Sequence, residues 1–185
     1  MLTFSPPENF PPGTVERLLK ESYAAIRPQL SERDWLKLVQ HHSDFEREVA
    51  THPEIARCTF ISVEDGIPVG LGCYDPRQRP VLGIIGDNVI LPSARGKGYG
   101  KLQLHEILRR LKEIGVQKVR VSTGDHPFFL SAQKNYQSVG FRETRRFIDD
   151  KWEAGQIEYE MGEDIKPFFP AYSHADCRRS RALPS

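Results

Sequence analysis

The segment from residue 81 to residue 124 constrains the fold more than any other part of the chain. It contains an apolar run, VLGIIGDNVIL, then a glycine-rich loop, a helical stretch and a second apolar run, VQKVRVSTG. Two strands of one sheet that are joined through a helix run parallel, because the helix carries the chain back to the same end of the sheet. The segment therefore predicts one parallel strand pair.

The remaining strand patterns point to antiparallel pairing. The stretch CTFISVEDGIPVGLGCYD reads as a hairpin that turns at Asp65 and Gly66, a pair that tight turns favour. The stretches FRETRRFI and QIEYEMGE read as a closing strand pair. We therefore predict an α/β (α+β) fold, in which helices flank a mixed, mostly antiparallel central sheet with one parallel pair.

Two amphipathic helices are expected before the sheet. The first spans about residues 15–26, with Thr14 as its predicted N-cap. The second begins after Ser31, which forms a capping pair with Asp34. We expect a single domain over residues 1–166 and a partly docked C-terminal extension, with a loose basic end, over residues 167–185.

The cysteines, histidines and apolar runs indicate the location of the protein and the kinds of site that it can contain. The cysteines are odd in number and far apart, so neither a disulfide framework nor a zinc site is predicted, and a reduced, cytoplasmic location fits them; they are Cys58, Cys73 and Cys177. The six histidines form no recognised metal-ligand pattern, although His126 is a candidate to border a site. No stretch is apolar for long enough to span a membrane, so no membrane association is expected.

The loop ARGKGYGK, residues 94–101, is the strongest candidate for a binding site. A phosphate-binding P-loop would need a glycine at Arg95 and a hydroxyl at Leu102, and a dinucleotide fingerprint would need a glycine at Lys101. What remains is a glycine-rich turn that leads into a helix, whose free amides suit a phosphate anion. Taken alone, the loop could still be a flexible basic turn.

A second motif changes the interpretation. The loop, with Arg95, Gly98 and Gly100 in register, resembles the Q/R-x-x-G-x-G/A signature of the GNAT superfamily of acetyl-CoA-dependent N-acyltransferases. Farther along, AQKNYQSVGF, residues 132–141, resembles the second signature of that family, A-x-x-x-Y-x-x-x-G-F. The order and spacing of the two motifs match as well. The resemblance covers most of the chain and implies acetyl-CoA as cosubstrate, with no metal.

The resemblance also implies roles for individual residues. The loop would hold the coenzyme pyrophosphate, and the backbone before it would align the pantetheine arm; these predicted coenzyme-binding residues are Ile90, Leu91, Arg95, Gly96, Lys97, Gly98, Tyr99, Gly100 and Lys101. Tyr136 would be the general acid near the departing thiolate, since a phenol stays protonated at neutral pH. Asp87 is the candidate general base, with a strand-end turn residue as the competing interpretation, and Asn88 could orient a water.

The sequence does not identify the acceptor substrate. We expect a primary amine on a small molecule or peptide, attacked in a ternary complex with acetyl-CoA. One alternative is a catalytically silent acyl-CoA sensor. Another is a nucleic-acid binder, but 26 basic against 25 acidic residues give a formal charge of +1 and no general attraction to a polyanion. A homodimer is compatible with the resemblance, because dimers are common among members.

Overall fold

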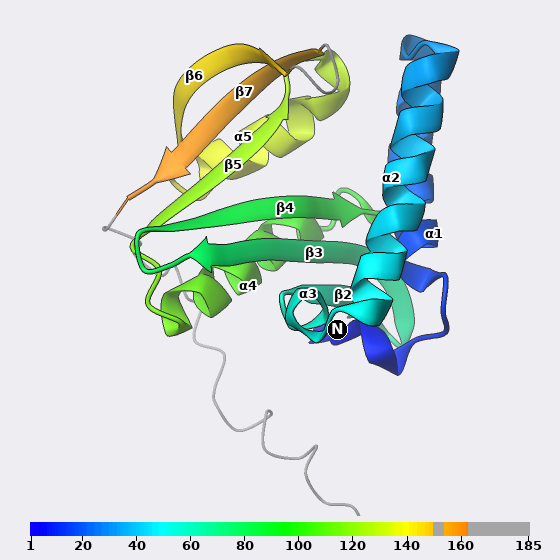
Figure 1. Cartoon of the computed structure of the whole chain (residues 1–185), viewed down its shortest axis with the longest axis horizontal. Coiled ribbons are helices and arrows are strands. Elements are labelled where there is room, and N and C mark those ends of the chain that lie inside the picture. The colour runs from blue at the N-terminus through cyan, green and yellow to red at the C-terminus, as the bar shows by residue number, and fades with distance from the viewer. Residues whose placement is uncertain (150–153, 163–185) are drawn as a thin grey trace, which may run out of the picture.

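The structure, a computed structural model, describes residues 1–149 and 154–162, so the predicted domain end at residue 166 and the extension 167–185 lie outside the described residues. The described part contains one seven-stranded sheet with the order β1-β2-β3-β4-β5-β7-β6 (Figure 1). The strands are β1 Leu2–Ser5, β2 Thr59–Glu64, β3 Ile67–Gln78, β4 Leu82–Ile90, β5 Lys118–Gly124, β6 Arg142–Asp149 and β7 Ala154–Met161.

The predicted fold class is confirmed. Within the described residues, β4 and β5 form the one parallel pair, and every other neighbouring pair is antiparallel. Their pairing is short and joins residues 82–85 of β4 to residues 118–121 of β5. Beyond it, β4 stays with β3 while β5 stays with β7, so the sheet splits into a V (Figure 1).

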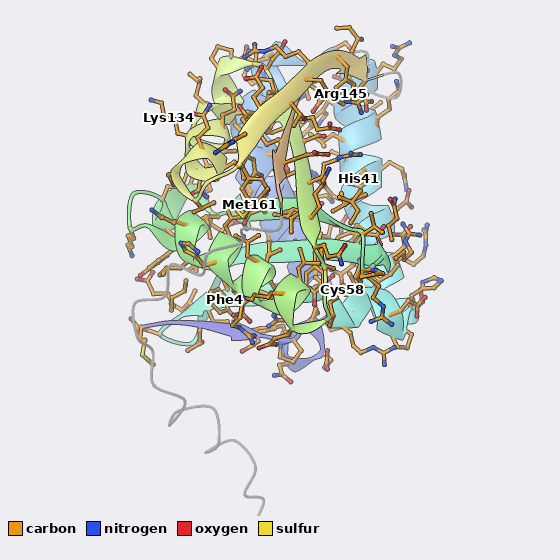
Figure 2. The ribbon with its side chains drawn as sticks, turned by 90° about the vertical axis from the view of Figure 1, so that its left-hand side faces the viewer. Phe4, His41, Cys58, Lys134, Arg145 and Met161 are labelled. Carbon is orange, nitrogen blue, oxygen red and sulfur yellow. The ribbon has the colours of Figure 1, made fainter. Side chains whose placement is uncertain are left out.

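Helices cover both faces of the sheet. The α-helices are α1 Thr14–Tyr23, α2 Glu32–Thr51, α3 Pro53–Arg57, α4 Tyr99–Glu113 and α5 Leu130–Ser138, and the short 3-10 turns are η1 Pro7–Asn9, η2 Ala24–Gln29, η3 Pro92–Ala94 and η4 Pro127–Phe129. In Figure 1, α1 and α2 cover one face of the sheet near one end of its strands, and α4 lies across the opposite face. One core cluster joins α1 and α2 to β2, β3 and β4, and a second joins α4 and α5 to the sheet and includes Met161 (Figure 2). A third, small cluster contains Val69, Ile90 and Ala94.

Local signals explain most helix and turn boundaries. Ser31 is the N-cap of α2, and its side chain accepts a hydrogen bond from the Asp34 amide, as predicted. The hairpin turns at Asp65 and Gly66, which both have positive φ angles of 48° and 84°. These angles suit the tight primed turn that connects twisted antiparallel strands.

The start of α1 differs from the prediction. Its N-cap is Gly13, and the Thr14 hydroxyl donates to the Pro11 carbonyl at 2.7 Å instead of accepting from the helix. The free amides at this end are satisfied from α2, because Glu46 accepts from Gly13 at 2.8 Å and from Glu16 at 2.9 Å. A cap supplied by a distant side chain cannot be read from local sequence. The helix also ends at residue 23 and tightens into η2, so the predicted span to residue 26 was too long.

Strand β4 contains an irregularity that positions the site. Tyr74 pairs with Ile85 and Gly72 pairs with Asn88, so one residue of β3 faces both Gly86 and Asp87 of β4. Such a bulge reverses which face the following side chains reach. Without it, Asp87 would share the face of Ile85; with it, Asp87 points toward α1 and α2.

Candidate active site

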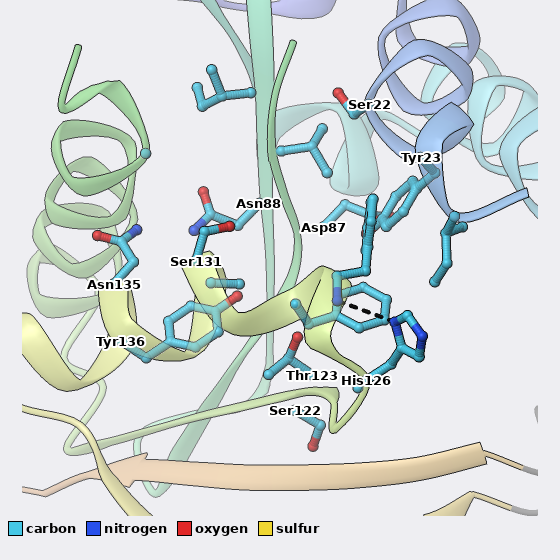
Figure 3. A pocket seen from close by; sticks show the side chains of 18 of the residues that line it. Ser22, Tyr23, Asp87, Asn88, Ser122, Thr123, His126, Ser131, Asn135 and Tyr136 are labelled. Atoms are coloured by element: carbon cyan, nitrogen blue, oxygen red, sulfur yellow. Dashed lines mark hydrogen bonds between the residues drawn. The ribbon is translucent and has the colours of Figure 1, made fainter. Parts of the chain in front are cut away.

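The diverging ends of β4 and β5 open onto a cavity of about 920 Å³. One part is lined by the end of β4, the glycine-rich loop and α5, and the other by α1, η2, α2 and the end of β5. Figure 3 shows its polar side chains arranged on two sides of β4. A cavity of this size at a strand opening is where a small-molecule site is expected.

The glycine-rich loop has the features of an anion site. Gly96 and Gly98 have φ angles of 80° and 78°, and a Cβ at either position would meet no atom within 4 Å. Within the described residues, the backbone amides of residues 96–100 donate no hydrogen bond, while the Lys101 amide already closes the first turn of α4 onto Gly98 at 3.1 Å. Unpaired amides at a helix N-terminus suit phosphate oxygens, so the loop fits the pyrophosphate of a coenzyme.

The cations of the loop are used differently from expectation. The Arg95 guanidinium donates to the carbonyl oxygens of Ile90 at 3.1 Å and Ser22 at 2.9 Å, so it ties the end of β4 to α1. Lys97 pairs with Glu64 at 2.9 Å and does not line the cavity. Lys101 does line it. Arg95 also lines the cavity, so the backbone amides, Arg95 and Lys101 can all act on an anion there, while Lys97 is engaged by Glu64.

Three other predicted coenzyme residues are placed as follows. Ile90 and Tyr99 line the cavity, and the Tyr99 hydroxyl donates to Glu64. Leu91 is buried, does not line the cavity, and donates its amide to Val69 at 2.8 Å. Ile90 is thus available to a ligand in the cavity, while the Leu91 amide is engaged in the sheet.

Tyr136 lies in the cavity wall on the α4 side of β4. It is 4% exposed, and burial raises the pKa of its phenol well above the usual range, with Asn88 acting in the opposite direction. The Asn88 side chain is held by Gln103, which is fully buried and also donates to the Leu71 carbonyl at 2.8 Å. A phenol held protonated in this way can donate a proton but cannot act as a base near neutral pH.

Asp87 lies on the opposite side of β4 (Figure 3). Its Oδ1 accepts from the Tyr23 hydroxyl at 3.1 Å, its Oδ2 lies 3.9 Å from His41 Nε2, and its amide donates to Cys73 Sγ at 3.1 Å. Burial raises the pKa of Asp87, while His41 and Tyr23 partly offset that effect. A buried carboxylate with a raised pKa is a better proton acceptor than an exposed one.

Sequence reasoning missed several of these side chains. Tyr23 and His41 lie within the two helices that the sequence predicts, and no local pattern shows that these helices bring them to Asp87. Two signals were available. Gln103 is a polar residue next to the apolar stripe of α4, and Gly86 inside an apolar strand is typical of a bulge.

The remaining candidates bring no further chemistry. His126 lines the cavity, and its Nδ1 accepts from the Phe128 amide at 3.1 Å, which caps η4 (Figure 3). No group of three or more His, Cys, Asp or Glu side chains that could hold a metal occurs in residues 1–149 and 154–162. None of the helices in those same ranges is both long enough and apolar enough to cross a membrane.

Comparison with known families agrees with this geometry. The model of the acetyltransferase (GNAT) family matches residues 15–141, which is most of the chain and includes both cavity-lining motifs. The chain therefore belongs to the GNAT family of acetyltransferases. No curated protein sequence matches it at a significant level.

Solved structures show the same fold at low sequence identity. The PaiA N-acetyltransferase of Thermoplasma acidophilum, solved with coenzyme A, has a TM-score of 0.69 at 14% identity, over 88% of this chain and 99% of its own. A putative GNAT acetyltransferase from Desulfovibrio desulfuricans has 0.68 at 15%, over 88% and 99%. The ribosomal-protein-S18-alanine N-acetyltransferase of Escherichia coli has 0.59 at 13%, over 88% and 94%. These likenesses establish the fold and leave the acceptor unassigned.

Proposed function

We propose that this protein is an acetyl-CoA-dependent N-acetyltransferase that transfers the acetyl group to a primary amine of a small molecule or peptide. One observation carries the proposal: a single cavity gathers the unpaired loop amides, the buried phenol of Tyr136 and the carboxylate of Asp87. These supply an anion cradle, a proton donor and a proton acceptor. The donor and the acceptor serve the proton transfers of acyl transfer from a thioester to an amine, and the cradle would hold the coenzyme.

Each group has one task in the proposed reaction. The amides of residues 96–100 and Lys101 bind the pyrophosphate of acetyl-CoA. Asp87 takes a proton from the substrate ammonium, whose nitrogen then attacks the thioester carbonyl carbon. As the carbon–sulfur bond breaks, Tyr136 gives its proton to the thiolate, and the second proton lost by the nitrogen restores the phenol.

Direct attack in a ternary complex is favoured over a covalent acyl-enzyme. Among the described residues, no cysteine lines the cavity. Cys73, beneath Asp87, is buried, and burial raises the pKa of its thiol well above the usual value. A thiol held protonated is a poor nucleophile. The scattered cysteines also keep the cytoplasm as the proposed location.

Ion pairs in the loop and on α4 weaken the case for a nucleic-acid binder. Lys97 pairs with Glu64, and both Arg109 and Arg110 pair with Glu106. Cations already neutralised by neighbouring carboxylates release few counterions from a polyanion, so no strong, salt-dependent binding to DNA is expected. The sensor alternative needs a direct test, because it uses the same fold and coenzyme.

The test combines turnover and binding. Thiol release from acetyl-CoA is followed against amino acids, peptide N-termini, polyamines and aminoglycosides, and acetylated products are identified by mass. We expect thiol release that depends on an amine. Tyr136→Phe should abolish most turnover and keep acetyl-CoA affinity, measured by calorimetry. Coenzyme binding with no acetylated amine in any class would favour the sensor instead.

A further inference from the structure

Asp87 meets two side chains that the proposed chemistry has not yet used. Tyr23 comes from the last turn of α1 (Figure 3), and His41 comes from the middle of α2 (Figure 2). Both line the same cavity. Tyr23 donates to Oδ1 at 3.1 Å, and His41 Nε2 stands 3.9 Å from Oδ2. The two oxygens of one carboxylate therefore have different neighbours and can have different roles.

A largely enclosed base must pass on the proton that it accepts. The side chain of Asp87 is 16% exposed, so a proton that it accepts from a substrate has little direct access to water, least of all when a substrate fills the cavity. Tyr23 offers no exit, because burial raises the pKa of its phenol well above the usual value and the hydroxyl stays a donor. Oδ1 is thus fixed as an acceptor, and the proton must leave through Oδ2.

His41 stands at that exit. Its side chain is 38% exposed, so one ring nitrogen faces the carboxylate while the imidazole still reaches solvent. An imidazole gains and loses protons readily near neutral pH, which is what a shuttle requires. The 3.9 Å separation is longer than a hydrogen bond, so a small ring movement or one bridging water completes the path.

We infer that His41 relays protons from Asp87 to solvent during each catalytic cycle. The inference rests on the proposed amine acetylation. The substrate ammonium loses one proton to Asp87, His41 takes it from the carboxyl group, and solvent takes it from the imidazolium. One proton leaves per acetyl group transferred, which matches the conversion of an ammonium and a thioester into an amide and a thiol. His41 is a positioning and relay residue that does not touch the reacting atoms.

The other ionisable groups near the pair stay in one charge state. Cys73 of β3 lies against Asp87, because its Sγ accepts from the Asp87 amide, and burial raises the pKa of its thiol well above the usual value. Tyr136 lies on the other side of β4, and burial raises the pKa of its phenol in the same way. His42, next to His41 on α2, is buried, and burial lowers its pKa to about 4. Asp44, one turn along α2, has a pKa lowered by its hydrogen bonds to Gln40 and Arg47, so it remains a carboxylate. Among these neighbours, His41 Nε2 is the group that stands beside Asp87 Oδ2, at 3.9 Å.

The test removes the imidazole and supplies one from solution. His41→Gln keeps a polar side chain of similar size, and His52→Gln, an exposed position at the end of the same helix, is the matched control. Acetylation of an amine found in the panel is measured in dilute buffer between pH 6 and pH 9 with saturating acetyl-CoA. We expect His41→Gln to lower kcat about ten-fold near neutral pH, with the KM for the amine changed less than two-fold.

Rescue separates a relay from a structural contact. Added imidazole should restore most of the lost kcat in His41→Gln and leave the parent protein and His52→Gln unchanged. A kcat equal to that of the parent, or a loss that imidazole does not restore, overturns the relay while the amine acetylation stands. If the parent protein acetylates no amine, the proposed function fails, and the relay that rests on it fails too.

Discussion

The two sides of β4 carry the two halves of the proposed chemistry in different physical ways. Asn88 points toward α4, where Gln103 and Tyr136 surround it, and Asp87 points toward α1 and α2, where Tyr23 and His41 surround it. Adjacent residues of a strand point to opposite faces, so a single dipeptide serves both clusters. The donor side is uncharged, while the acceptor side holds a charge that must change during the reaction.

The buried polar side chains on the two sides of β4 also differ, in whether their hydrogen bonds are satisfied. Gln103 is fully buried, and its amide is hydrogen-bonded through both the oxygen and the nitrogen. His42 is also fully buried, yet neither ring nitrogen has a hydrogen-bond partner among the described residues. A satisfied network fixes one arrangement, and an unsatisfied group costs stability. We therefore expect the donor side to be rigid and the acceptor side to be marginal.

The largest effect should come from removing the acceptor-side charge. Asp87→Asn keeps the shape and the hydrogen bond from Tyr23 but cannot take a proton, so kcat should fall about 10³-fold. Because burial raises the pKa of Asp87, its contribution to stability is full below the ordinary value of 3.8 and is lost as pH rises through the raised value. The variant should therefore melt at a higher temperature at pH 7.

Lost activity together with gained stability would distinguish a catalytic base from a structural ion-pair partner. Glu48→Gln, at an exposed position of α2, serves as the control for both measurements and should change neither activity nor melting temperature appreciably. If Asp87→Asn melts at a lower temperature, the carboxylate is a structural ion-pair partner, and the contrast between the two sides disappears.

The second effect concerns the donor side. Gln103→Leu removes the acceptor for Ser62 and the donor for Asn88 in a fully buried place, so the free energy of unfolding should fall by about 3 kcal/mol. Activity should fall as well, because Asn88 loses the group that orients it toward Tyr136. Urea unfolding with steady-state kinetics checks both. Gln40→Leu, at an exposed site, should change stability by less than about 0.5 kcal/mol. Equal losses in the two variants would contradict the special role of the network.

The same contrast explains how far the sequence could predict the site. The loop and Tyr136 were identified because glycines at fixed spacing and a tyrosine in a motif are local patterns. The β-hairpin at Asp65 and the cap at Ser31 were predictable for the same reason. The role of Asp87 depended on a bulge that reverses its face, and its partners come from α1 and α2. Such contacts form only when distant segments pack, so spacing along the chain cannot reveal them.

The third effect tests the marginal packing of the acceptor side. Burial lowers the pKa of His42 to about 4 from a usual 6.5, so protonation favours the unfolded chain. Its contribution is full above 6.5 and is lost as pH falls toward 4, which amounts to about 2 kcal/mol between pH 7 and pH 5.

His42→Phe should remove this dependence. The ring still stacks on Tyr23, whose centroid lies 5.5 Å from that of His42, but it cannot take a proton. Unfolding free energies at pH 7 and pH 5 should then differ by about 2 kcal/mol less than in the parent protein. His52→Phe is the control and should keep the parent difference. A His42→Phe variant with an unchanged pH dependence would mean that the imidazole has a partner in solution.

The smallest effect should come from Tyr23→Phe, which removes one hydrogen bond to Asp87 and leaves the carboxylate in place. The Tyr23 hydroxyl lowers the pKa of Asp87, so its loss should raise that pKa further, by less than one unit for a hydrogen bond of about 1 kcal/mol. The acidic limb of kcat/KM for the amine should move to higher pH by the same amount, with the plateau at alkaline pH unchanged. A uniform fall at all pH values would instead show that Tyr23 shapes the amine pocket. Tyr74→Phe, with its hydroxyl outside the cavity, is the matched control and should leave the limb in place.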